Sequence, residues 1–115
     1  MKNNNLELKS THHQLSLHII NRIYKKMRNG IKFDDIKVFD DLIIDGHHRY
    51  IASLFTDYTL GKVLSNKTSA TTEYSWDTVS FVEEEWDTPD KIQYLNELDA
   101  KFNNVTVEEV IEMIK

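Results

Sequence analysis

The order of helix-like and strand-like segments predicts an α+β domain with a short mixed sheet and flanking helices. Three observations support this. Apolar residues recur at helical spacing near both ends of the chain, two short apolar runs in the middle are separated by an acidic turn, and helix-capping residues precede two late segments. With 115 residues, 40% of them hydrophobic, the chain is long enough to bury a core as one domain, residues 1–115.

The first helix is expected over residues 11–29, where apolar residues recur every three or four positions. Asn29-Gly30 then supplies a stop signal. The preceding residues 1–9 are polar and are expected to be flexible. The apolar stripe of this helix predicts that it packs on the core and turns a basic face outward.

Two strands are expected at residues 36–39 and 42–44, joined across Asp40-Asp41 as a β-hairpin. A helix over residues 48–56 should follow the second strand. A strand interrupted at a glycine is then expected over residues 58–64.

The C-terminal half begins with a polar loop, residues 65–73, followed by a short strand over residues 78–82. Thr88-Pro89 predicts a helix start, since threonine caps a helix well and proline suits its first position. Thr106 has capping-box spacing to Glu109, which predicts a last helix. The helix after Pro89 is expected to bury an apolar stripe of Ile92, Leu95, Leu98 and Phe102.

Composition excludes several classes of function. The net charge of −5 opposes a protein that coats nucleic acid nonspecifically. Without cysteine the chain forms no disulfide and no thiolate metal site. It has no apolar leader and no run long enough to span a bilayer, so we expect a cytoplasmic protein with no membrane partner.

The segment Asp45-Gly46-His47-His48-Arg49-Tyr50 is the strongest functional signal, because it joins a strand to a helix. Gly46 permits a positive φ and close backbone approach. The N–H groups of the following first helical turn carry partial positive charge, which favours an anion. Arg49 adds paired donors that match phosphate oxygens. Gly46, His48 and Arg49 are therefore the predicted phosphate-binding residues.

The predicted catalytic residues are His47, His48, Arg49 and Asp45. An unperturbed imidazole exchanges a proton near neutral pH, so either histidine could move a proton while Arg49 stabilises charge on phosphate. The histidines are adjacent and should play different roles. Asp45 either caps the loop, the favoured interpretation, or acts as a general base or cation ligand.

Residues 36–54, with the Asp-Gly-His-His-Arg-Tyr loop, resemble the core of the ParB/sulfiredoxin-like superfamily. The residue sequence of this loop is similar to that found in ParB-like nuclease domains of polymorphic toxins and mobile elements. This resemblance implies a small ParB/sulfiredoxin-like fold whose loop cradles phosphate. Sulfiredoxin chemistry is excluded, because His47 stands where its cysteine would be. The short chain leaves no room for the DNA-binding and dimerisation regions of a partitioning ParB.

Two functions follow from these residues and the resemblance. In the first, the domain binds a nucleotide or nucleic acid and hydrolyses a phosphoester, as a nuclease or nucleotidase of toxin or effector type. In the second, it is a non-catalytic nucleotide-binding or protein-interaction module that acts as a switch or antagonist. Mg²⁺ accompanying a nucleotide is the only cofactor suggested. A cognate immunity or target protein is the suggested protein partner.

Other charged and aromatic groups have simpler interpretations. His12, His13 and His18 do not share a helix face, so surface positions are favoured over a metal site, and none is predicted. Residues 83–87 are interpreted as a solvated acidic edge with Trp86 turned inward, in preference to a cation site. Lys62 and Lys67 are candidates to approach the phosphate.

Overall fold

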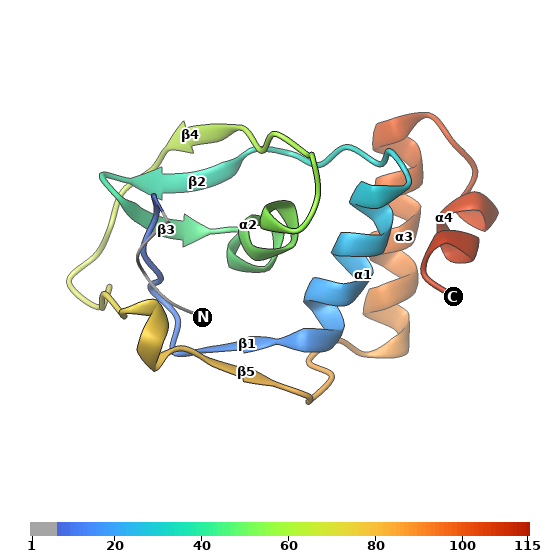
Figure 1. The fold of residues 1–115 in the computed structure, drawn as a ribbon. Coiled ribbons are helices and arrows are strands. Elements are labelled where there is room, and N and C mark those ends of the chain that lie inside the picture. Colours follow the sequence, from blue (N-terminus) through green and yellow to red (C-terminus); the bar gives the residue numbers. More distant parts are fainter. Residues whose placement is uncertain (1–6) are drawn as a thin grey trace.

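The computed structural model describes residues 7–115 as an α+β domain with four helices. Its mixed sheet contains β2 (Ile36–Phe39), β3 (Leu42–Asp45) and β4 (Lys62–Leu64) in the order β3-β2-β4. β2 pairs antiparallel with β3 and parallel with β4 (Figure 1). The predicted hairpin and short mixed sheet are thus confirmed.

A second pair of strands lies apart from this sheet. β1 (Gln14–Ser16) pairs parallel with β5 (Ser80–Val82) along the lower side in Figure 1. The predicted helix over residues 11–29 is therefore wrong in its first part, where His12 and His13 precede a strand. The physical reason is Ser16, whose hydroxyl accepts a hydrogen bond from the Ile19 N–H and so caps a helix that begins at the next residue.

Helices α1 (Leu17–Arg28) and α2 (His47–Leu54) pack directly on one another. In Figure 1, α2 lies between the mixed sheet and α1, and the last two helices lie beyond α1. The main core forms where these layers meet. Its most deeply buried side chains are Leu15, Ile36, Ile43, Ile51 and Trp76.

The segment before β1 is fixed to this core. Leu8 is buried, and its carbonyl accepts a hydrogen bond of 2.8 Å from the Trp76 indole N–H. Lys9 forms backbone hydrogen bonds with Asp41 and Ile43. Residues 8 and 9 of the segment expected to be flexible are thus attached to the core by specific contacts, while residues 1–6 lie outside the described residues.

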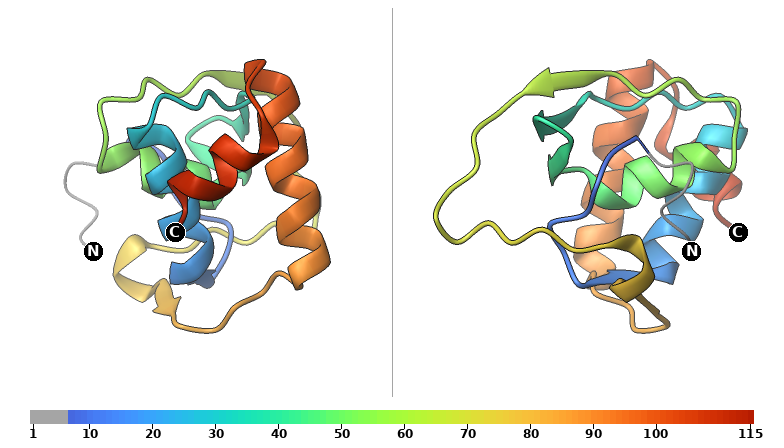
Figure 2. Two further views of the ribbon diagram at one scale, coloured as in Figure 1. Left: turned by 90° about the vertical axis from the view of Figure 1, so that its right-hand side faces the viewer. Right: turned by 60° about the vertical axis from the view of Figure 1, so that its left-hand side comes forward.

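Helices α3 (Pro89–Asn103) and α4 (Val107–Met113) form a hairpin at the other end of the molecule (Figure 2). Both predicted caps are confirmed: the Thr88 hydroxyl accepts from the Lys91 N–H, and the Thr106 hydroxyl accepts from the Glu109 N–H. The predicted burial of the α3 stripe is wrong for Leu98 and Phe102, which are exposed, while Ile92 and Leu95 are half-buried. The side that α3 buries instead carries Asn96 and Ala100.

The remaining secondary-structure predictions are confirmed in outline. Residues 65–73 form a loop that swings away from the sheet (Figure 2). The two predicted strands on either side of it are shorter than expected, as β4 and β5. Between the loop and β5 lies a 3-10 turn, η1 (Trp76–Thr78). In the described range, no helix has the length and apolar character needed to cross a membrane.

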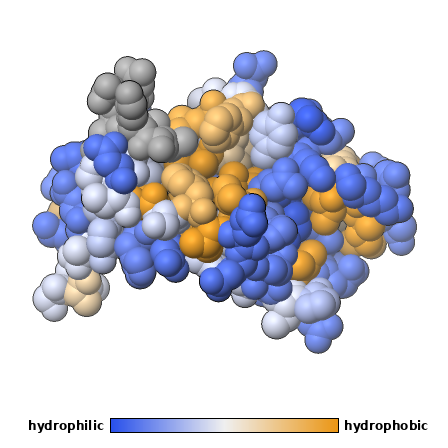
Figure 3. Space-filling model, turned by 60° about the horizontal axis from the view of Figure 1, so that its bottom comes forward, coloured by the Kyte–Doolittle hydropathy of each residue, from blue (hydrophilic) through white to orange (hydrophobic). Residues whose placement is uncertain are grey.

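Apolar surface remains exposed on this small domain. In the space-filling view of the lower face, apolar patches are separated by hydrophilic side chains (Figure 3). The most exposed large apolar side chains include Leu64, Phe55 and Phe102. They belong to β4, the end of α2 and the end of α3, so different elements contribute to the exposed apolar surface.

Candidate functional site

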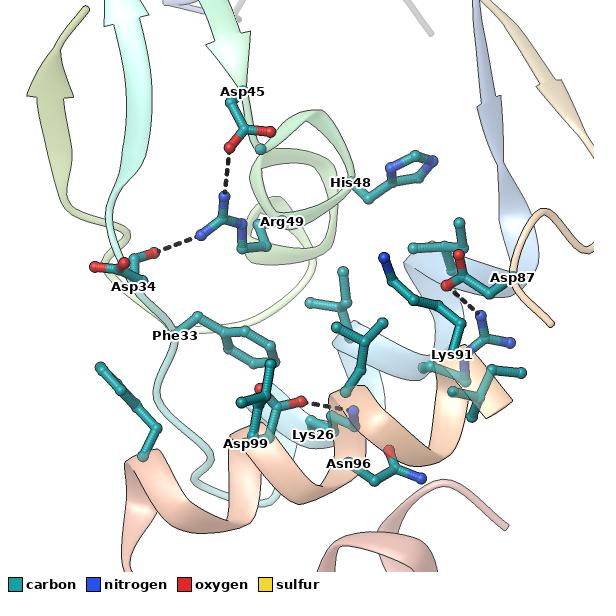
Figure 4. Close-up of a pocket in the computed structure, with 18 of the residues that line it drawn as sticks. Lys26, Phe33, Asp34, Asp45, His48, Arg49, Asp87, Lys91, Asn96 and Asp99 are labelled. Carbon is teal, nitrogen blue, oxygen red and sulfur yellow. Dashed lines mark hydrogen bonds and ion pairs between the residues drawn. The ribbon is translucent and has the colours of Figure 1, made fainter. Parts of the chain in front are cut away.

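A cleft of about 860 Å³ lies between the first turn of α2, α1, residues 32–34 and α3 (Figure 4). All four predicted catalytic residues and Gly46 line it. Its apolar lining comes from α1, from the segment before β2 and from α3: Ile19, Ile23, Phe33, Ile92, Leu95, Leu98 and Phe102. The structure thus brings the predicted loop to a cavity of the size that small-molecule sites have.

Gly46 is the N-cap of α2 and has a φ of 106°, as the predicted strand-to-helix turn requires. A Cβ at this position would collide with the Ile36 side chain and would lie 2.9 Å from Nη2 of Arg49. The first backbone hydrogen bond of α2 runs from the Tyr50 N–H to the Gly46 carbonyl, at 2.9 Å. The N–H groups before Tyr50 therefore lie ahead of the helical hydrogen-bond ladder, which is the feature of a helix start that attracts anions.

Arg49 extends into the cleft beside Phe33 (Figure 4). Its Nη1 donates to the Asp34 carbonyl at 2.9 Å, and its Nη2 lies 3.7 Å from Oδ2 of Asp45. The side chain is 20% exposed. Asp45 thus pairs with the predicted phosphate ligand, an arrangement that neither predicted role for Asp45 included. These partners fix the guanidinium and leave part of it open to the cleft.

His47 is 2% exposed and accepts a hydrogen bond at Nε2 from the Thr11 N–H, at 3.0 Å. Burial, followed by the neighbouring His12 and His48, lowers the pKa of His47 to about 3. The neutral ring therefore holds its proton on Nδ1, which has no hydrogen-bond partner among residues 7–115. The His12 ring stacks on it at a centroid distance of 4.0 Å.

His48 has a different partner, as the adjacent positions predict. Its Nε2 accepts from the Ser16 N–H at 3.0 Å, and its ring meets Trp86 edge-on at 5.4 Å. Burial, followed by His12, lowers the pKa of His48 to about 4, although Asp87 opposes this. At neutral pH both imidazoles are therefore neutral acceptors that connect α2 to the segment around β1.

Lys91 is the cleft residue that sequence reasoning missed. It extends from the first turn of α3 into the space facing α2 (Figure 4). Its ammonium makes no ion pair or side-chain hydrogen bond with any described residue. The two lysines predicted to approach the phosphate lie elsewhere: Lys62 pairs with Glu7 at 3.6 Å, and Lys67 lies over the Phe39 ring. No local signal marks Lys91, because its position depends on how α3 packs.

Two cations of α1 that line the cleft are paired with carboxylates. Lys26, buried on α1, binds Asp99 of α3 at 2.7 Å. Arg22 binds Glu85 and also Asp87, the latter at 3.3 Å. Pairing with Arg22 lowers the pKa of Glu85. Glu85 and Asp87 of the acidic segment 83–87 therefore neutralise Arg22 of α1.

The structure also tests the sequence-based interpretations of Trp86 and His12. Trp86 is 41% exposed and contacts His48, so the prediction that it turns inward is wrong. His12 is exposed, as predicted, but it also belongs to the cleft through its stacking on His47. In the described part of the chain, no three His, Cys, Asp or Glu side chains converge as metal ligands would.

Comparisons with protein-family models, curated proteins and solved structures find no match to this chain. The superfamily resemblance therefore depends on residues 36–54 alone and stays a prediction.

Proposed function

We propose that this protein binds the phosphate group of a nucleotide-sized ligand at the start of α2, as the ParB/sulfiredoxin-like resemblance implies. The supporting observation is the unpaired Lys91 ammonium, which enters the same cleft as the α2 N-terminus and Arg49. A helix start, a guanidinium and a free ammonium together favour a phosphate. The apolar lining provides a surface for the rest of the ligand.

Binding has more support than turnover. Both histidines use Nε2 to hold backbone N–H groups, so neither imidazole can use that atom to take a proton from a nucleophile. No cluster of metal-ligating side chains occurs in residues 7–115, so Mg²⁺ would enter with the phosphates of a nucleotide. The geometry therefore favours the non-catalytic, switch-like alternative.

Phosphoester hydrolysis, as in a nuclease or nucleotidase of effector type, is the second candidate. The observation that favours it is that Asp45, His47, His48 and Arg49, the predicted catalytic residues, all line one cleft. Release of inorganic phosphate or of shortened oligonucleotide, lost in His47→Gln, would support this candidate over binding alone.

The test of binding is calorimetric titration with AMP, ADP and ATP, with and without Mg²⁺, of the wild-type chain and of Lys91→Gln. We expect Lys91→Gln to weaken binding about tenfold, the effect of losing one charge-assisted contact. Lys62→Gln is the matched control, because it removes the same charge outside the cleft. Equal affinities in the two variants, or no binding by the folded wild-type chain, would contradict the proposal.

A further inference from the structure

The exposed apolar side of α3 forms one wall of the cleft. Leu95, Leu98 and Phe102 line it, and Leu98 and Phe102 remain 43% and 60% exposed. The opposite side of α3 packs inward through Ala100, in a small cluster with Ile31 and Val110. The helix thus buries one side and leaves a continuous apolar stripe facing the space in front of Arg49.

Charge is distributed unevenly along this wall. Lys91 is free at the end near α2, whereas Lys26 in the middle is neutralised by Asp99. Lys101, which also lines the cleft, is ten residues further along α3, roughly 15 Å at 1.5 Å per residue. Lys32 and Lys101 are, like Lys91, without an ion pair among the described residues. A small ligand that reaches Lys91 meets the apolar side chains between Lys91 and Lys101 beyond its phosphate.

A nucleic acid strand would fit this arrangement poorly. Polymer binding depends on several cations that each neutralise a phosphate. Here Lys91 and Lys101 lie roughly 15 Å apart along α3 with apolar side chains between them, so successive phosphates of a strand would meet aliphatic groups between the two cations. Sugar hydroxyls would also lose water against aliphatic side chains without gaining partners, which costs free energy.

We infer that the ligand is a single phosphate ester with an apolar ring or chain as its body, and that the α3 wall selects this body. This inference rests on the proposed function and specifies its ligand class. The phosphate binds between the α2 N-terminus and Lys91, and the body lies on Leu95, Leu98 and Phe102. Leu98 is then a specificity-determining residue, because it lies about 10 Å beyond Lys91 along the helix.

The test compares four probes by calorimetric titration: inorganic phosphate, ribose 5-phosphate, 1-naphthyl phosphate and an eight-nucleotide single strand. We expect 1-naphthyl phosphate to bind about tenfold more tightly than ribose 5-phosphate, the difference expected for burying part of an apolar ring. Leu98→Gln should remove most of this preference and leave the affinity for inorganic phosphate unchanged. Tyr94→Gln is the matched control, since Tyr94 is an exposed apolar residue of α3 outside the cleft lining.

The outcomes separate the two proposals. Equal, Lys91-dependent binding of ribose 5-phosphate and 1-naphthyl phosphate would overturn the apolar selection and leave the phosphate site standing. Tighter binding of the oligonucleotide would overturn the assignment to a single phosphate ester. Absence of binding for all four probes, with a folded protein, would overturn the phosphate site and the inference with it.

Discussion

At the scale of the residue, Gly46 has two constraints that no other amino acid meets at once. Its φ of 106° lies in the left-handed region, and the space for a Cβ is taken by Ile36. The sequence predicts that Gly46 allows the backbone to approach a ligand closely. In the structure, the group nearest to a Cβ at this position would be the buried Ile36 side chain of β2. Packing against the sheet therefore already requires glycine.

We therefore expect Gly46→Ala to lower the free energy of unfolding by about 3 kcal/mol, combining backbone strain with overpacking. Gly30→Ala is the control, because Gly30 also has a positive φ, of 90°, but has open space where a Cβ would be. It should cost about 1 kcal/mol. Urea denaturation measures both, and equal losses would show that the contact with Ile36 is unimportant.

Because of His47 and His48, we expect the free energy of unfolding to fall in mild acid. Their pKa values fall from 6.5 to about 3 and about 4 on folding, so the unfolded chain binds more protons below pH 6.5. Their stabilising contribution is complete above pH 6.5 and is lost as the pH falls toward the folded values. At pH 5 the loss is about 2 kcal/mol for each imidazole.

Urea denaturation between pH 7 and pH 5 measures this effect, in a range above the ordinary titration of carboxylates. His47→Gln should flatten the profile, although its stability at pH 7 is lower. His18→Gln should keep the full slope, because His18 is exposed on α1. A wild-type stability that stays constant from pH 7 to pH 5 would contradict the burial of the two rings.

At the scale of the element, α3 is attached to α1 by a nearly buried ion pair. The side chains of Lys26 and Asp99 are 5% and 20% exposed. Beside it, Asn103 exchanges hydrogen bonds with the backbone of Lys32. These polar contacts hold α3 across the cleft while its apolar stripe stays open.

Asp99→Ala should therefore lower the free energy of unfolding by about 3 kcal/mol, because it leaves a buried ammonium without a partner. The double variant Lys26→Met, Asp99→Leu should recover most of this loss, since an apolar pair of similar size replaces the ion pair. Chemical denaturation of the single and double variants tests this. A double variant no more stable than Asp99→Ala would show that the ammonium is not the source of the cost.

At the scale of the whole molecule, the cleft joins segments that are far apart in the chain. The loop after β3, the middle of α1 and the full length of α3 all contribute to it. A ligand that binds there contacts the sheet side and the α3–α4 hairpin at once, and so stabilises the folded chain as a unit.

A phosphate ester present at about a hundred times its dissociation constant should add roughly 2.7 kcal/mol of stability, which raises Tm by several degrees. A thermal-shift measurement with 1-naphthyl phosphate, in wild type and in Lys91→Gln at the same ligand concentration, tests this. The shift should shrink in Lys91→Gln and persist in Lys62→Gln. Equal shifts in all three proteins would place the bound ligand outside the cleft.

The sequence by itself determined the features that depend on near neighbours. The hairpin around Asp40-Asp41, the glycine at the start of α2 and the caps at Thr88 and Thr106 are confirmed, because each depends on residues within a few positions. Helical spacing likewise located α1 and α3. The short mixed sheet and the α+β class followed from the order of these segments.

Only the tertiary structure decided which groups meet. His47 and His48 accept N–H groups from Thr11 and Ser16, more than thirty residues away, so their burial and low pKa values could not be predicted from the loop. The α3 stripe has the same pattern whether it faces a core or a cleft, because periodicity defines a side of a helix and not its neighbour. The packing of α3 alone brought Lys91 to the predicted phosphate loop.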